Sequence, residues 1–189
     1  DGKSLNSLVK LYLDINGNPC VTSDGYASVK IVSDSKGNEL ERWTYDENKQ
    51  LVITSGGFAG ITAEYDSRGY MVKMMHHGAD GELCEMNEGY AGIYYEYNAN
   101  GDVIKYSCVG TDLEPTAGND NVCTMVLDRD LNGNIVKVSF FDVENYSTLS
   151  SEGISVMKFK YDDNGNEVSR QFFDQDDNLT KGNLGYAQI

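Results

Sequence analysis

Apolar and polar residues alternate along most of this chain, in short runs that end at glycine-containing turns. In residues 28–33, for example, Val29 and Ile31 alternate with Ser28 and Lys30. An alternation with a period of two is typical of a β-strand that buries one face. The same pattern continues after the next turn, so the chain is predicted to be all-β and built of antiparallel hairpins.

The hairpins recur with a period of 32 residues. The turn glycines that share this spacing are Gly37, Gly69, Gly101, Gly133 and Gly165. The motif Gly-Tyr-Ala or Gly-Phe-Ala keeps the same interval and begins at Gly25, Gly57, Gly89 and Gly185. A fixed period of this length, without insertions, is the mark of a repeat architecture.

We therefore divide residues 1–189 into one repeat array. The divisions are a partial repeat at 1–10, full repeats at 11–42, 43–74, 75–106, 107–138 and 139–170, and a partial repeat at 171–189. One repeat has too few apolar residues to offset its own ordering entropy. We expect the repeats to stack as a solenoid-like or spiralling antiparallel array.

Each turn begins with Asp or Asn and reaches glycine at its fourth residue, as in Asp34 to Gly37. The first side chain can accept a hydrogen bond from the backbone two residues on, and glycine adopts the left-handed conformation without strain. We expect a four-residue turn, which pairs Ile31 with Leu40 and keeps both on the buried face. A three-residue turn would put them on opposite faces. The strand after the turn then has an inward column made of Leu40, Val72, Ile104, Val136 and Val168.

The chain is acidic, with a net charge of −15 over 189 residues. This balance argues against nucleic acid, because a phosphate-binding surface needs clustered Lys and Arg. No apolar stretch approaches the roughly 20 residues of a membrane span, so membrane insertion is not expected. Solubility is the simplest explanation of the charge, and a cationic partner or Ca²⁺ is the alternative.

One stretch resembles the start of a calcium loop. Asp128, Asp130 and Asn132, followed by Gly133, have the spacing of its first oxygen ligands. However, Ser139 occupies the place of the bidentate Glu. Since the same register elsewhere in the array is a plain turn, we predict no metal site and no cofactor, and keep these three residues as a weak Ca²⁺ candidate.

No residue set specifies a reaction. His76 and His77 adjoin on one predicted strand, so they point to opposite faces and cannot hold one ion together. The four cysteines have no zinc-like spacing, and we interpret them as small buried hydrophobes in preference to a Cys108–Cys123 disulfide. The chain is therefore predicted to have no catalytic residues and not to be an enzyme.

The aromatic residues recur near strand ends and loops. The simplest interpretation is that they form the core. The alternative is that grooves between successive repeats expose aromatic faces, which stack on sugar rings or hold a protein segment. The candidates for such ligand binding are Trp43, Tyr45, Tyr90, Tyr94, Phe141 and Phe173.

The turns at Tyr65-Asp66-Ser67-Arg68-Gly69 and Tyr161-Asp162-Asp163-Asn164-Gly165-Asn166 resemble the YD repeats of RHS-type proteins. The chain is more distantly similar to the hairpins of choline- and glucan-binding modules. This resemblance implies a bacterial secreted or surface protein, hence an extracellular or cell-surface location, and no catalytic residues. The first hypothesis is a repeat scaffold and binding module that contacts glycan or protein through aromatic surfaces between repeats. Its other expected partners are neighbouring repeats or domains of a longer parent protein. The alternative is a structural spacer or an RHS-like shell segment.

Overall fold

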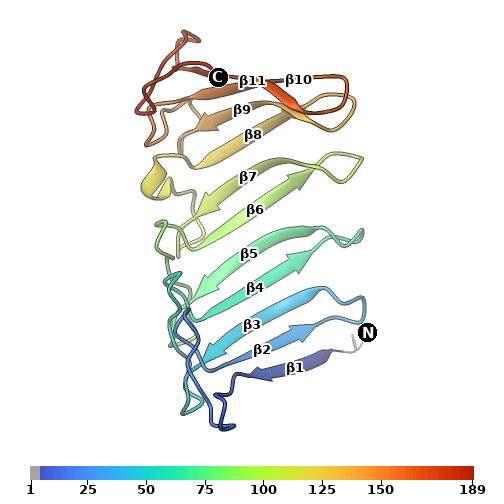
Figure 1. Ribbon diagram of the computed structural model, residues 1–189, viewed down its shortest axis with the longest axis vertical. Coiled ribbons are helices and arrows are strands. Elements are labelled where there is room, and N and C mark those ends of the chain that lie inside the picture. Colours follow the sequence, from blue (N-terminus) through green and yellow to red (C-terminus); the bar gives the residue numbers. More distant parts are fainter. Residues whose placement is uncertain (1–4) are drawn as a thin grey trace. The chain divides into compact units, whose positions relative to one another are not determined.

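The computed structural model describes residues 5–189, a part of the chain that consists of strands, turns and one short 3₁₀ turn at Gly118–Asp120 (Figure 1). The strands are β1 (Asn6–Leu11), β2 (Ser28–Ser33), β3 (Glu39–Tyr45), β4 (Gly60–Tyr65), β5 (Met71–His77), β6 (Gly92–Tyr97), β7 (Val103–Val109), β8 (Thr124–Arg129), β9 (Ile135–Phe141), β10 (Val156–Tyr161) and β11 (Glu167–Phe173). The prediction of an all-β chain of antiparallel hairpins is confirmed.

The described residues form two compact units. The first contains the residues up to Ile93 together with Gly110–Leu113, and the second contains Tyr94–Val109 and Glu114–Ile189. Within the first unit, β1 to β5 pair antiparallel in chain order. Within the second, β7 to β11 do the same. The single array over residues 1–189 stays a prediction.

The same backbone hydrogen bond recurs from repeat to repeat. Ala27 donates its N–H to the carbonyl of Tyr45 at 2.8 Å, and Ala59 donates to His77 at 2.7 Å. In the second unit the equivalent donors and acceptors are Cys123 with Phe141 and Ser155 with Phe173. These donors lie at multiples of 32 residues from one another. The repeat period therefore corresponds to one recurring element of backbone structure.

The turns differ from the four-residue form expected. Asp34 and Asn38 close a turn of three residues, in which the Asp34 N–H donates to the Asn38 carbonyl at 2.9 Å. A bulge between Val32 and Ser33 then adds one residue to the returning strand, so Ile31 lies opposite Arg42 rather than Leu40. Gly37, with φ of 90°, supplies the left-handed residue of this turn-and-bulge form. A three-residue turn alone would put the apolar residues of the two strands on opposite faces, and the extra residue of the bulge puts them back on the same face. The alternation of apolar and polar residues therefore could not reveal this turn.

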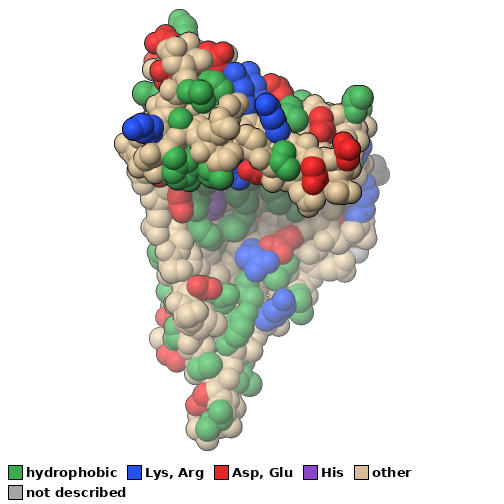
Figure 2. Space-filling view, turned by 45° about the horizontal axis from the view of Figure 1, so that its top comes forward, with side chains coloured by type: hydrophobic (Ala, Val, Ile, Leu, Met, Phe, Trp, Pro, Cys, Tyr) green, Lys and Arg blue, Asp and Glu red, His purple; other side chains and the backbone are tan. Residues whose placement is uncertain are grey.

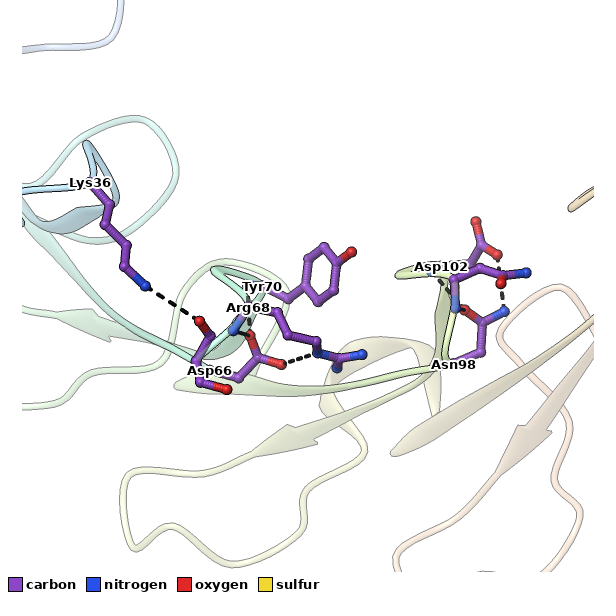
Figure 3. A network of polar contacts seen from close by, with 8 residues as sticks. Lys36, Asp66, Arg68, Tyr70, Asn98 and Asp102 are labelled. Atoms are coloured by element: carbon purple, nitrogen blue, oxygen red, sulfur yellow. Dashed lines mark hydrogen bonds and ion pairs between the residues drawn. The ribbon is translucent and has the colours of Figure 1, made fainter.

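The first side chain of each turn holds it closed. At Asp66 the carboxylate accepts the N–H groups of Arg68 and Tyr70, at 2.9 and 3.0 Å, and also pairs with the Arg68 guanidinium (Figure 3). Lys36 of the preceding turn donates to the Ser67 carbonyl at 3.3 Å (Figure 3). This turn is thus fixed internally and linked to the preceding turn by a side chain.

The core follows the repeat. Ala27, Ala59 and Ala91 are fully buried, and Thr44 and His76 are buried at a second recurring position. In the second unit, the residues at these two positions include Cys123, Ser155, Cys108, Phe140 and Phe172. Phe140 and Phe172 form a cluster with Val122, Val138 and Ile154. Burial is therefore strongest at the strand ends distant from the Asp-x-x-Gly turns.

The inward column predicted after the turn is only partly correct. Leu40, for example, is half-buried, and Val168 is 59% exposed. Residues 187–189 lie beside β11 through backbone bonds to Arg170 and Phe172, and no such bond reaches Val168. The end of the strand nearer the turn therefore lacks the cover that a neighbouring strand provides.

Candidate functional site

The aromatic candidates occupy two sides of the hairpins. Trp43 and Tyr45 are two residues apart in β3, so they share one face. Phe141 and Phe173 end β9 and β11 at the position equivalent to Tyr45. Tyr90 lies elsewhere, with its ring centroid 6.0 Å from that of the buried His76. Tyr94 lies in β6 and is partly exposed. The six residues are thus not one cluster.

A groove lies beside Tyr45 at the end of β1 to β3. Its volume is ≈ 460 Å³, and it is lined by Val9, Leu11, Pro19, Ser28, Lys30, Tyr45, Asp46, Glu47 and Lys49. Val9 is 63% exposed and Leu11 is 55% exposed. The floor is therefore apolar, while the rim carries both cations and carboxylates. Figure 2 shows one face of the molecule, on which apolar side chains are interspersed with Lys, Arg, Asp and Glu.

Trp43 packs against the neighbouring strands β4 and β5. It lies opposite Gly60 in the β3–β4 pair, and its ring so closely covers that glycine that a side chain there would collide with it. The ring centroid is 5.2 Å from that of His77, and the indole N–H donates to Glu41 at 3.0 Å. The Trp43 ring is thus already used in contacts within the chain.

Phe173 carries a cation over its ring. The Lys158 ammonium lies 4.0 Å from the ring centroid and pairs with Asp177 at 2.8 Å. Cation–π contacts of this kind at exposed sites contribute roughly 0.5–1 kcal/mol. Phe141 is partly exposed at the equivalent strand end. The surface of the second unit therefore has aromatic faces, one of which is already covered by a lysine.

The two histidines point to opposite faces of β5, as predicted. His76 is buried beside Phe58, at 4.8 Å between centroids, and its Nδ1–H donates to the Ala91 carbonyl at 3.1 Å. Burial lowers the pKa of His76, because desolvation disfavours the imidazolium. His77 instead donates from Nδ1 to the Gly81 carbonyl and contacts the Thr62 hydroxyl through Nε2. The buried His76 ring is thus a structural group, and its lowered pKa favours the neutral form.

The calcium candidate is a turn of the common type. The Asp130 carboxylate accepts hydrogen bonds from the Asn134 side chain and from the N–H groups of Asn132 and Asn134, which lower its pKa. Asp128 lies in β8, opposite Lys137 and 3.8 Å from its ammonium. Among residues 5–189 there is no group of three or more His, Cys, Asp or Glu side chains placed to hold a metal. The binding of Ca²⁺ by Asp128, Asp130 and Asn132 stays a weak prediction.

The cysteines are free thiols. Cys108 and Cys123 are buried, and the Cys123 thiol donates to the Cys108 carbonyl at 3.6 Å. Burial raises the pKa of Cys108 to about 11. Such a thiol is a poor nucleophile, because the reactive species is the thiolate. This agrees with their interpretation as small buried hydrophobes, although Cys20 and Cys84 are only half-buried.

Sequence reasoning identified Tyr45 but missed the groove around it. Val9 lies in the partial repeat at 1–10 and Leu11 begins the next repeat, and neither they nor Lys30 and Lys49 were among the candidates. A signal was present. Alignment of the repeats places Leu11 at the position of Trp43, so a large side chain is replaced by a smaller one. That difference is the sequence signal that accompanies the groove.

No protein family model matches the sequence, and no curated protein matches it. Among solved structures, the chain is similar to the Photorhabdus luminescens Tc holotoxin pore with a mutated TccC3 component, at 15% identity and a TM-score of 0.42. It is also similar to the TcdB2-TccC3-TEV structure, at 11% identity and a TM-score of 0.21. The alignments cover 88% of this chain but 8% and 13% of those chains, so this chain spans a small part of their length.

No helix in the described part of the chain is both long and apolar enough to cross a membrane.

Proposed function

We propose that this chain is a non-catalytic scaffold of stacked hairpin repeats within a longer bacterial protein that is secreted or displayed at the cell surface. Its exposed aromatic side chains contact a partner, either a glycan or a protein. The proposal draws on the resemblance of the Tyr-Asp-x-x-Gly turns to YD repeats of RHS-type proteins. It also draws on the contacts that the polar and aromatic side chains make within the described residues.

The observation that carries the scaffold role is the recurring bond between repeats. The carbonyls of Ala27, Ala59 and their equivalents accept an N–H from the preceding hairpin, as Ala59 does from Thr44 at 2.9 Å, and a side chain adds a second bond. The Thr44 hydroxyl, for example, donates to the Ala59 carbonyl at 2.9 Å. The carboxylates with lowered pKa, such as Asp66 and Asp162, close turns through backbone and Asn groups. These polar groups hold the turns and the repeats together.

The partner-binding role is supported by what remains exposed. Tyr45 borders an open apolar groove, and Tyr94 is one of the exposed large hydrophobic residues. Aromatic rings with one apolar face and one polar end are the side chains most often used in recognition. Such a surface could bind a flat sugar face or a protein segment.

The test is a glycan and protein-partner binding screen of the wild-type chain and two variants, Tyr45→Ala and Tyr94→Ala. We expect saturable binding that at least one of these variants reduces about tenfold or more, with an unchanged β-sheet circular dichroism spectrum. Leu131→Ala is the matched control, because Leu131 is fully exposed at a turn and its removal should leave binding unchanged. Binding that all three variants retain would contradict the role of the aromatic surface.

The second candidate is a purely structural spacer or RHS-like shell segment. The packing of Trp43 on Gly60 and of Lys158 on Phe173 favours it, because both use aromatic surface internally. This candidate predicts that the chain binds no ligand saturably. It also predicts that Trp43→Ala only reduces the free energy of unfolding.

A further inference from the structure

We propose that the groove beside Tyr45 is a docking site for a tryptophan side chain presented by a partner protein. The inference rests on the proposed partner-binding function and specifies the partner chemistry at one place. The groove lies entirely within the first compact unit.

The chain itself shows which group fits this place. The three positions that surround the groove recur 32 residues later, where Leu11, Ser28 and Tyr45 correspond to Trp43, Gly60 and His77. The strand pairing is the same in both repeats, since Leu11 lies opposite Ser28 and Trp43 lies opposite Gly60. In the later repeat, the indole of Trp43 covers the strand pair and lies against His77 at 5.2 Å between centroids. An indole is therefore the occupant that the same backbone accommodates one repeat away.

In the earlier repeat this occupant is missing from the chain. Leu11 is smaller than Trp43 and remains 55% exposed, and the space it leaves opens into a groove of ≈ 460 Å³. That volume is within the range of roughly 300–1,000 Å³ found for ligand sites. It holds an indole together with part of the chain that presents it. An apolar floor formed by Val9, Leu11 and Pro19 suits an aromatic ring better than a sugar, whose hydroxyl groups would need partners there.

The rim supplies the polar contacts of an indole. Lys30 and Lys49 provide cations, and tryptophan is the aromatic side chain that binds cations most strongly. In the second unit, the residues equivalent to these two lysines are Lys158 and Asp177, which pair with each other. In the groove the carboxylate of that pair is replaced by Lys49, so the two cations face an incoming ring. Glu47 can accept the indole N–H, as Glu41 does for Trp43 at 3.0 Å.

The experiment titrates the full chain with N-acetyl-tryptophanamide and follows the methyl signals by NMR. We expect saturable shifts at Val9 and Leu11, with a dissociation constant in the millimolar range for this isolated probe. N-acetyl-leucinamide and methyl glucoside are the comparison probes, and neither should saturate the same signals. If methyl glucoside does so instead, or if both amides act equally, the inference is wrong.

A self-plugged variant tests the geometry. Leu11→Trp combined with Ser28→Gly reproduces the Trp43–Gly60 pair, and the glycine is needed because a side chain opposite would collide with the ring. We expect this variant to lose binding of the probe at least tenfold. Leu131→Trp is the matched control, since it adds an exposed tryptophan at a turn of the second unit and should leave the affinity unchanged.

A single substitution covers the case in which the double variant does not fold. Lys49→Asp copies Asp177 and should weaken probe binding several-fold by pairing with Lys30. Unchanged affinity in Lys49→Asp and in any folded self-plugged variant would overturn the inference. The two proposals can be told apart. If the groove binds no probe but the chain still binds a glycan or protein and Tyr94→Ala abolishes that binding, only this inference is wrong. If the chain binds no partner saturably, the proposed function is wrong as well.

Discussion

Gly133→Val tests the turn-and-bulge form on which the hairpins depend. Gly133 has a φ of 89°, in the left-handed region that only glycine adopts freely. A Cβ atom built there meets nothing within 4 Å, so a substitution causes no collision and its cost is conformational. For a β-branched residue that cost is about 2–3 kcal/mol. The unfolded chain of the variant has less conformational entropy than that of the wild type, which offsets this cost by about 0.4–1 kcal/mol. We expect a net loss of about 1–2.6 kcal/mol in the free energy of unfolding.

The assay is urea denaturation followed by circular dichroism. With a slope of about 2 kcal/mol/M, this loss lowers the midpoint by about 0.5–1.3 M. Gly133→Asn is the matched control, because Asn145 already adopts a φ of 65° at a turn of the next repeat. Asn should lower the midpoint by less than half as much as Val. Equal midpoints for the wild type and both variants would refute the assignment of a left-handed turn residue.

Two further predictions concern buried groups. Burial lowers the pKa of His76 in the folded state below its ordinary value of 6.5. As the pH falls below 6.5, the unfolded state therefore binds more protons than the folded state. The free energy of unfolding is thus highest above pH 6.5 and decreases as the pH falls. His76→Thr, which copies Thr44, should remove that part of the pH dependence of urea midpoints between pH 7 and 5, and an unchanged dependence would contradict the assignment. Cys108, with a pKa of about 11, should react with iodoacetamide far more slowly at pH 8 than the half-buried Cys20. Peptide mass spectrometry measures this order, and labelling of Cys108 first would show that its burial is wrong.

The candidate site could be predicted only in part. Tyr45 was found because aromatic residues near strand ends are conspicuous in a sequence. Its partners were not found, since Pro19, Lys30 and Lys49 come to Tyr45 from separate loops and strands. Tyr90 was chosen on the same ground, and only the structure shows that its ring approaches the buried His76. Pattern analysis reports which side chains are large, while only packing shows which of them remain exposed.

The sequence by itself determined the period of 32, the positions of the turns and the strands between them. These features are local, since a glycine at the fourth turn residue and a run of alternating side chains restrict the backbone wherever they occur. Only the tertiary structure decided the register and the two compact units. A three-residue turn with a bulge and a four-residue turn without one both keep Ile31 on the buried face, so alternation cannot distinguish them. The choice is made by the hydrogen bonds that Asp34 accepts from Lys36 and Asn38, which close the shorter turn.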